Sequence, residues 1–554
     1  MKIKQILLFL IILSFGGFLR FYGLFWDSGF HLQPDERFLT FVSIAMTPPH
    51  TLWQYFNPMT SSLNPFLLNF SFYVYGIFPL TLNKILAILF HTNTYSLLTF
   101  QGRVLSGFFD LLTLCFVFLF ARLLNEKYIH KALFPFYAMF FYAIAVLPIQ
   151  LSHFFTVDMF ANFFAFSSCY FSLRFVLKNE SKSLLLSALL IGLAIASKIN
   201  SGLILPLNIF FISSFFLSGH VKDPKKRILK TLLLVSVYFL ISYIFLRVAD
   251  PYMFANSNPF NPMPHPLFRE SLQILYNEYS PTTNFPPAFQ WLSKTPILFS
   301  LKNIMFFGLG IPFFLCFLFG SFIIYKKYRK TYFSPLLFWC IFVFVLQAIQ
   351  FAQTMRYFIF LYPFFALIAG LFATILFRRV LFLLKIIFFC TLLTWPLAFF
   401  SIYIHPNTRI AASIWINQHI NPHAVILNEY WDDSLPLFQS DQNKYAILQL
   451  PVFDVDTDVK WQKMNDLVQQ SDYLVLSSPR AWATIESLPQ KYPKMSKWYR
   501  DLFSGKLPFK KAAEFHSYPS LSYLGIPITF PDTSAEEAFT VFDHPQVFIF
   551  QHIR

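Results

Sequence analysis

The sequence predicts an α-helical polytopic membrane protein of about eleven transmembrane helices with a small C-terminal α/β domain. Three observations lead to this fold class. The chain of 554 residues is 56% hydrophobic and only 13% charged, and its mean hydropathy is +0.53. Apolar runs close to the roughly 20 residues that a bilayer-spanning helix needs recur throughout residues 1–400. The tail, residues 401–554, is more polar and carries short apolar runs of strand length.

Eleven segments have the hydropathy expected of membrane spans. They are 5–26, 101–124, 132–149, 156–177, 183–198, 202–218, 230–247, 302–325, 332–350, 356–377 and 380–400. The first is interpreted as a retained span rather than a cleaved signal peptide, because Arg20 and Trp26 stand where a small-residue cleavage site should be. We expect Arg20 to extend its charge toward the outer headgroups.

The net charge of +16 is explained by the placement of the basic residues. Lys and Arg fall in every second connection between the predicted spans, for example in KDPKKRILK and YKKYRK, whereas LPIQLSHFFTVD and IQFAQTM contain none. This alternation predicts a cytoplasmic N-terminus and an extracytoplasmic tail in a multi-pass protein of the plasma membrane. The expected contacts of the basic residues are membrane lipid headgroups, not nucleic acid.

The chain is expected to divide into a membrane domain, 1–400, and an extracytoplasmic α/β domain, 401–554. Of the outer loops of the membrane domain, 27–100 should hold helices near 34–46 and 64–90, and proline-rich 248–300 should lack regular structure. In the tail, RIAASIWINQHI and VKWQKMNDLVQQ have helical periodicity. AVILNE, YAILQL, DYLVLSS and QVFIFQ have the length and composition of strands.

Ionisable and polar aromatic side chains gather at the outer ends of the predicted spans. They are His31, Asp35, Glu36, Arg103, His153, Asp158, Lys198, Arg356 and Tyr357. Each has an ordinary structural alternative: the acids of QPDERF suit the first turn of a helix, and the cations can anchor spans at the interface. As a set they favour a functional site, because anchors favour the cytoplasmic face and ionisable groups at membrane depth are functional candidates.

Carboxylates beside cations at the rim of a membrane bundle suit glycosyl transfer from a lipid-linked sugar phosphate. The cations would stabilise the leaving phosphate, and a carboxylate would accept the proton of the attacking hydroxyl. Adjacent helical residues point about 100° apart. Asp35 and Glu36 therefore cannot both face one reacting atom, and we expect one of them to be structural.

FLRFYGLFWDSGFHLQPDERFLT resembles the first span and acidic motif of the C-type (GT-C) glycosyltransferase superfamily, within it the family of protein O-mannosyltransferases and bacterial aminoarabinose transferases. The similarity continues in QGRVLSGFFDLLTLCFVFLFARLL, LSHFFTVDMFANFFAF, GLAIASKINSGLILP and TMRYFIFLYPFFALIAG. It implies a catalytic acid at Asp35, a second acid at Asp158, and donor-phosphate contacts by Lys198 and Arg356. Many members have Arg where this chain has His153.

The candidate roles follow from the residues and the resemblance together. Asp35, Glu36 and Asp158 are the catalytic candidates; Lys198, Arg103 and Arg356 are the phosphate-binding candidates; His153, His31 and Tyr357 are candidate substrate contacts. The expected reaction is inverting transfer of a mannose-like hexose or an aminopentose. The donor is a polyprenyl-phosphate sugar, and the acceptor is a protein, a lipid or a cell-wall polymer.

Two other classes of protein stay open. An oligosaccharyltransferase or polysaccharide ligase would use a diphosphate-linked donor, and a transporter would bind its solute near the bilayer midplane between inverted repeats. No metal is firmly predicted, because Asp35, Asp158 and His153 are suitable ligand types without tight ligand spacing. A divalent cation stays an alternative.

Overall fold

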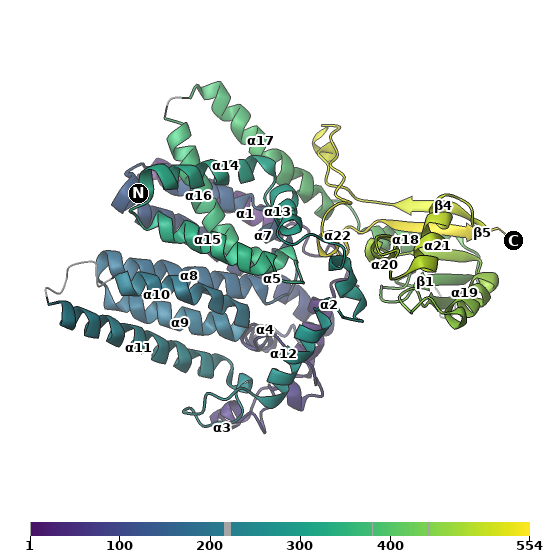
Figure 1. Ribbon diagram of the computed structural model, residues 1–554, viewed down its shortest axis with the longest axis horizontal. Helices are drawn as coiled ribbons and strands as arrows, with labels where there is room; N and C mark the ends of the chain where they lie inside the picture. Colours follow the sequence, from purple (N-terminus) through teal and green to yellow (C-terminus); the bar gives the residue numbers. More distant parts are fainter. Residues whose placement is uncertain (1, 215–222, 379, 440–443, 554) are drawn as a thin grey trace.

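The computed structural model describes residues 2–214, 223–378, 380–439 and 444–553. A bundle of helices forms one side of the molecule, and a small sheet with its own helices forms the other (Figure 1). The N-terminus lies at the end of the bundle that is remote from the sheet, and the C-terminus lies on the far side of the sheet. The chain is therefore mostly helical, with a sheet near its C-terminal end.

Seven helical segments of the described chain are long and apolar enough to cross a membrane. They contain α1 (Ile3–Phe21), α5 (Tyr95–Leu124), α8 (Asp158–Lys178), α11 (Pro224–Ala249), α14 (Ile311–Ile323), α16 (Tyr362–Leu376) and α17 (Phe382–Phe400). An eighth candidate is the pair α6 (Phe134–Ala143) and α7 (Val146–Ser152), which is bent by 56°. Repeated apolar helices of this length indicate a multi-pass membrane protein.

The predicted count of eleven spans is not confirmed. Three of the predicted spans are shorter apolar helices, namely α9 (Ser181–Ser197), α10 (Leu205–Ser213) and α15 (Phe333–Ala348). Hydropathy alone does not reveal where a 3₁₀ turn such as η3 (Ile199–Ile204) interrupts an apolar run. Residues 215–218 of the predicted span 202–218 lie outside the described residues.

Short helices shape the two long connections that the sequence places outside. The first connection holds α2 (Pro34–Ala45), α3 (Leu52–Phe56) and α4 (Phe78–Leu89). Of these, α2 matches the predicted helix near 34–46, whereas α4 covers only the second half of the helix predicted near 64–90. The second connection was expected to lack regular structure, yet it contains α12 (Pro266–Glu278) and α13 (Leu298–Asn303). Pro266 is the first residue of α12, a position that needs no intrahelical N–H donor, so this proline begins a helix.

The tail folds as a five-stranded mixed sheet of order β2-β1-β3-β5-β4. The strands are β1 (Val425–Glu429), β2 (Ala446–Leu450), β3 (Tyr473–Leu476), β4 (Phe509–Phe515) and β5 (Val547–His552). β1 is parallel to β2 and β3, and β5 is antiparallel to β3 and β4. The sequence analysis missed β4, because its FKKAAEF pattern is charged; β4 is an edge strand, where charge is common.

Helices cover both faces of this sheet. Alternate residues of the strands face opposite sides, so Leu474 and Leu476 pack in one core while Val475 packs in the other. The helices α19 (Asp458–Gln470), α20 (Pro479–Glu486) and α21 (Pro493–Phe503) contribute to the first core. The helix α18 (Thr408–His419) contributes to the second core.

Between β4 and β5 the chain returns to the helical bundle, and we call residues 530–545 the return segment. It contains the short helix α22 (Glu537–Thr540). The ring of Phe539 is buried in the main core, with its centroid 5.8 Å from that of Phe307 and 5.2 Å from that of Phe399. The return segment therefore joins the sheet domain to the bundle.

Arg20 does not extend to the headgroups, so that prediction is wrong. Its side chain is fully buried, and its Nε lies 2.5 Å from a carboxylate oxygen of Asp110 in α5. Its guanidinium also donates to the backbone carbonyls of Tyr142 and Ala143. A buried acid partner, which the sequence analysis did not weigh, holds this cation inside the bundle.

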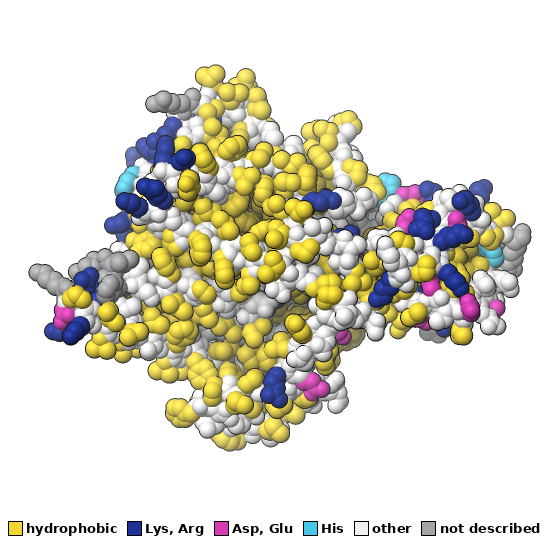
Figure 2. All heavy atoms as spheres, in the orientation of Figure 1, with side chains coloured by type: hydrophobic (Ala, Val, Ile, Leu, Met, Phe, Trp, Pro, Cys, Tyr) yellow, Lys and Arg dark blue, Asp and Glu magenta, His cyan; other side chains and the backbone are white. Residues whose placement is uncertain are grey.

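Basic side chains are unevenly distributed over the helical bundle. Figure 2 shows Lys and Arg gathered at the end of the bundle remote from the sheet domain, with mostly hydrophobic surface over the middle. Three exposed lysines lie here: Lys127 and Lys131 follow α5, and Lys178 is the last residue of α8. An ion pair between Lys178 and Glu126 joins the C-terminal ends of the two helices. The bundle thus has one strongly basic end.

Candidate functional site

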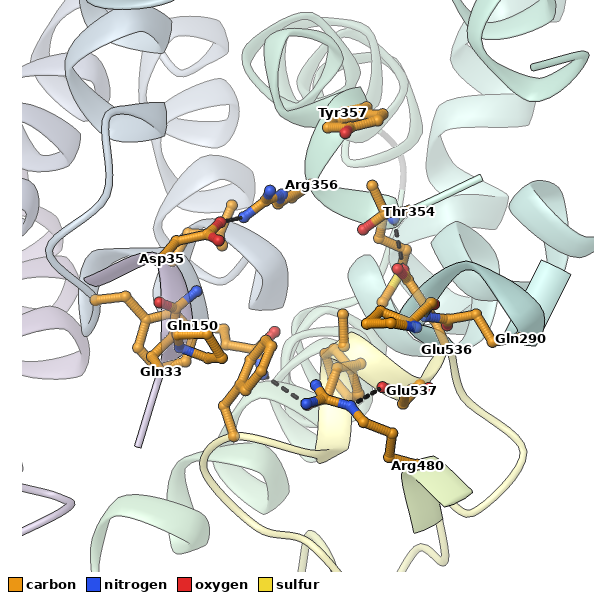
Figure 3. A pocket seen from close by; sticks show the side chains of 18 of the residues that line it. Gln33, Asp35, Gln150, Gln290, Thr354, Arg356, Tyr357, Arg480, Glu536 and Glu537 are labelled. Carbon is orange, nitrogen blue, oxygen red and sulfur yellow. Dashed lines mark hydrogen bonds and ion pairs between the residues drawn. The ribbon is translucent and has the colours of Figure 1, made fainter. Parts of the chain in front are cut away.

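A cavity of about 310 Å³ lies between the bundle and the sheet domain. Its polar walls include Asp35, Arg356, Tyr357, Arg480, Glu536 and Glu537 (Figure 3). Asp35 comes from the start of α2, and Arg356 and Tyr357 come from the 3₁₀ helix η9 (Met355–Leu361). Small-ligand sites commonly occupy roughly 300–1,000 Å³, so the cavity is large enough to hold one.

Asp35 and Arg356 form an ion pair at the cavity wall (Figure 3). The helix that carries Asp35 begins as the sequence predicts, with Pro34 in its first turn and the Gln33 side chain accepting the Glu36 N–H. Both charged side chains are 25% exposed. A charged pair that is open to a cavity can exchange one partner for a charged or polar group of a substrate.

A second ion pair joins Lys198 to Asp158. Lys198 Nζ lies 2.6 Å from the carboxylate of Asp158, the first residue of α8. Lys198 Nζ also lies 5.3 Å from the centroid of the Tyr357 ring, and the Arg356 guanidinium lies 5.8 Å from the same centroid. The structure thus brings Asp35, Arg356, Asp158 and Lys198 together around Tyr357.

Glu36 points away from this group and into the protein. Its carboxylate is fully buried and lies 2.5 Å from Arg103, which also contacts the buried Asp27 at 2.6 Å. Burial raises the pKa of Glu36 above its usual range, and Arg103 acts in the opposite direction. Burial also acts to raise the pKa of Asp27, but the charge of Arg103 and the hydrogen bonds from Arg103 and Gly29 together outweigh it, and the pKa is lowered. Glu36 and Arg103 therefore hold the fold together, and their positions do not support catalysis or phosphate binding.

Asp27, His31 and Glu36 are spaced as three ligands of a metal ion could be. Burial lowers the pKa of His31 to about 4, so its imidazole is neutral, and neither ring nitrogen has a hydrogen-bond partner among the described residues. However, every carboxylate oxygen of the two acids already accepts a hydrogen bond from Arg103. A divalent ion would have to displace the guanidinium, so this group does not fit a metal site.

The side chain of His153 also contacts only other parts of the protein interior. Its ring stacks on Tyr403 with a centroid separation of 3.7 Å, and its two nitrogens lie 2.7 and 2.9 Å from the backbone oxygens of Ile149 and Tyr22. The side chain is fully buried. It does not approach the cavity as the sequence analysis expected of a substrate contact.

The wall that faces Asp35 was not anticipated from the sequence. It is formed by Gln290 of the second outer connection and by Glu536 and Glu537 of the return segment, with Arg480 of α20 (Figure 3). Arg480 Nε donates to Glu537 at 2.7 Å. These segments are distant in sequence, and their residues share no spacing that would reveal a common site.

Glu536 is the most unusual acid of this wall. It is 1% exposed, its Oε2 accepts the Met355 N–H at 2.6 Å, and its own N–H donates to Asn303. Burial raises the pKa of Glu536 to about 7, against the opposing effects of the hydrogen bonds from Met355 and Thr354. A carboxyl poised near neutral pH in a cavity is a functional candidate.

One family matches part of the chain. Residues 98–244 match the family described as dolichyl-phosphate-mannose-protein mannosyltransferase. No curated protein sequence matches the chain.

Solved structures match it over most of its length. The oligosaccharyltransferase of Archaeoglobus fulgidus, solved with a tethered acceptor peptide, is 13% identical with a TM-score of 0.54, over 100% of this chain and 89% of that one. AglB of the same organism, in complex with an inhibitory peptide and a dolichol-phosphate, is 14% identical with a TM-score of 0.51, over 96% and 75%. ArnT of Cupriavidus metallidurans, bound to undecaprenyl phosphate, has a TM-score of 0.38 at 13% identity, over 82% and 93%.

The family match and the shared fold agree with each other. The matched segment contains most of α5 and all of α8 and α9, and with them the ion pair between Asp158, which begins α8, and Lys198, which follows α9. The fold shared with the archaeal enzyme extends from the first helix through the sheet domain. On these grounds residues 98–244 are similar to the dolichyl-phosphate-mannose-protein mannosyltransferase family, and the chain shares its fold with the archaeal oligosaccharyltransferase.

Proposed function

We propose that this enzyme is an inverting glycosyltransferase that moves a single sugar from a polyprenyl-phosphate donor to a hydroxyl-bearing acceptor. The observation that carries the proposal is the pairing of Asp35 with Arg356 at the cavity wall, with the pair of Asp158 and Lys198 also beside Tyr357. AglB was solved with a dolichol-phosphate, which supports a donor of this class.

In the proposed reaction the acceptor oxygen attacks the anomeric carbon as the bond from that carbon to the phosphate oxygen breaks. Asp35 receives the hydroxyl proton, and polyprenyl phosphate leaves. Arg356 and Lys198 neutralise the charge on the departing phosphate. Asp158 holds Lys198 in place through their ion pair.

We also propose that the cavity faces the extracytoplasmic side of the plasma membrane. The basic connections support this orientation by the positive-inside rule, with the N-terminus cytoplasmic and the tail outside. In this arrangement residues 1–400 form the membrane domain and 401–554 form the extracytoplasmic domain. The sugar is a mannose-like hexose or an aminopentose, and the acceptor is a protein, a lipid or a cell-wall polymer.

The fold shared with an oligosaccharyltransferase supports a second candidate. Such an enzyme would transfer an oligosaccharide from a diphosphate-linked donor, and one related structure contains Zn and sulfate. With two cations available for a monophosphate, we expect activity of the purified protein to survive EDTA. Complete loss that added divalent metal restores would favour the second candidate.

The substitution Asp35→Asn tests the proposal. An amide keeps the size of the side chain but cannot accept the proton, so turnover should fall by roughly 10²–10⁴ while the protein folds and binds donor. The measurement is release of polyprenyl phosphate by protein purified in detergent, with monodispersity checked by gel filtration. Exposed Asp466→Asn is the matched control and should leave turnover unchanged. Wild-type turnover in the Asp35→Asn protein would refute the assignment.

A further inference from the structure

We propose that the wall of the cavity formed by Gln290, Trp291, Glu536 and Trp431 is a binding site for a carbohydrate acceptor. This inference rests on the proposed function, because Gln290 and Glu536 lie across the cavity from Asp35, the proposed base (Figure 3), and Trp291 and Trp431 line the same cavity. It names the class of molecule whose hydroxyl Asp35 would deprotonate.

Three side chains of this wall carry polar atoms without partners. Gln290 Oε1, Trp291 Nε1 and Glu536 Oε1 are shielded from solvent and have no hydrogen-bond partner among the described residues. Trp291 and Glu536 are 6% and 1% exposed. Shielded polar groups in native proteins are nearly always paired, and these three atoms belong to residues that line one cavity. Two acceptors and one donor complement a ligand with several hydroxyl groups.

Trp431 adds an aromatic surface. Its backbone φ is 79°, in the left-handed region that bulky residues rarely adopt, although its side chain remains 39% exposed. Its carbonyl oxygen accepts a hydrogen bond from Arg480, and its ring meets Phe285 edge to face. An uncommon backbone conformation that presents a large ring to solvent points to a function of that ring.

The same residue joins two cavities. Pro34, Trp431, Arg480 and Phe542 line both the main cavity and a neighbouring one of about 280 Å³. The second cavity also contains Arg37 and Asp433, which form an ion pair. A molecule longer than one sugar ring could therefore extend past Trp431 while its terminal hydroxyl lies near Asp35.

The chemistry of the wall favours a saccharide over a peptide. Extended peptides commonly bind by adding a strand to a free sheet edge; no described residue of the five strands lines the main cavity, and Gln449 of the edge strand β2 lines only the second cavity. A sugar ring instead presents an apolar C–H face, which suits an exposed indole ring, and a rim of hydroxyl groups, which suits amide, indole N–H and carboxylate partners.

Glu536 contributes to this wall at a cost to folding. Burial raises the pKa of its carboxyl to about 7 from the usual value near 4.5, so the native state loses stability as the pH rises from about 4.5 to about 7, and the loss is complete above that range. Glutamine would keep an oxygen for the Met355 N–H without that cost. A buried acid that a neutral isostere could replace points to a role in binding.

An array that carries mono- to tetrasaccharides and, beside them, serine- and threonine-containing peptides tests the proposal. The full-length protein in detergent is applied to the array, and the protein retained on each spot is measured. We expect wild-type protein to be retained on a subset of the saccharides. Glu536→Gln and Trp431→Gly should each reduce that retention at least tenfold, while their melting temperatures at pH 8 stay equal to or above wild type. The matched controls Glu270→Gln and Trp53→Ala alter exposed residues outside the cavity and should bind as wild type does.

Retention on peptides alone, on neither class, or equally by the variants and wild type would overturn the carbohydrate site. A second assay distinguishes failure of the carbohydrate site from failure of the proposed function. It measures the slow hydrolysis of the polyprenyl-phosphate sugar in the absence of an acceptor. Hydrolysis that Asp35→Asn abolishes and the exposed control Glu270→Gln retains would leave the donor chemistry standing. Absence of donor hydrolysis and transfer in wild type would remove both proposals.

Discussion

Asp35 and Glu36 are neighbours in one helical turn, yet they meet opposite environments. Asp35 is open to the cavity beside Arg356, whereas Glu36 is sealed inside the protein against Arg103. The separation follows from the roughly 100° between successive residues of a helix. It explains how one acid of the pair can take part in chemistry while the other stabilises the helix that positions it.

The substitution Glu36→Gln should therefore harm folding more than chemistry. Removing one partner of a buried ion pair costs about 3–5 kcal/mol, and we expect the lower end because Asp27 still contacts Arg103. The apparent melting temperature should fall clearly below that of Asp35→Asn, while turnover per folded molecule stays closer to wild type. A Glu36→Gln protein that melts normally but is inactive would instead place Glu36 in the reaction.

At the scale of elements, the return segment is the part that carries Glu536 and Glu537 to the cavity. It is held by His544, whose two nitrogens lie 2.5 and 2.8 Å from carboxylate oxygens of Asp543 and Asp532. Asp543 also accepts hydrogen bonds from Gln150 and Tyr403 of the bundle. The two aspartates raise the pKa of His544 to about 10, despite its burial, which acts to lower it.

This clamp should weaken in alkaline solution. Because the pKa of His544 is higher in the folded protein than its ordinary 6.5, its stabilisation is complete below about pH 6.5 and is lost as the pH rises toward 10. His544→Gln should lower the melting temperature most at pH 6 and least near pH 10. The measurement is the melting temperature of the wild-type and His544→Gln proteins at several pH values between 6 and 10. A difference that does not depend on pH would exclude a charged His544.

At the scale of the whole molecule, basic residues gather at the bundle end remote from the sheet domain. A multi-pass protein whose basic connections face the cytoplasm would place the cavity and the sheet on the other side. This separation would let the enzyme meet a lipid-linked donor in one leaflet and an acceptor in the space outside.

Fusions of alkaline phosphatase, which folds to an active form only outside the cytoplasm, test this orientation. A fusion after the last residue of the chain should be active, and a fusion at Lys326, in the YKKYRK connection, should be inactive. Equal expression of both fusions is checked by immunoblotting. The reverse pattern would put Asp35 in the cytoplasm and contradict the proposed reaction.

The sequence by itself determined the membrane class, the start of α2 and four of the five strands. These features depend on local properties, namely apolar run length, first-turn residues and strand composition. The helix in the second outer connection was missed, because dense proline can begin a helix as well as exclude one. The number of membrane spans could not be predicted from local sequence either, because short apolar helices and full spans have similar hydropathy.

Only the tertiary structure decided which polar residues share a site. It brought Asp35, Asp158, Lys198 and Arg356 around Tyr357. It also placed Arg20 and Arg103 in buried ion pairs, where an interfacial and a phosphate-binding cation were expected, and it showed that Glu36 is the buried member of the acid pair. Glu536 and Trp431 reach the cavity from a distant part of the chain, and no local pattern marks them. The physical reason is that burial and partner choice depend on packing between elements, which sequence spacing does not encode.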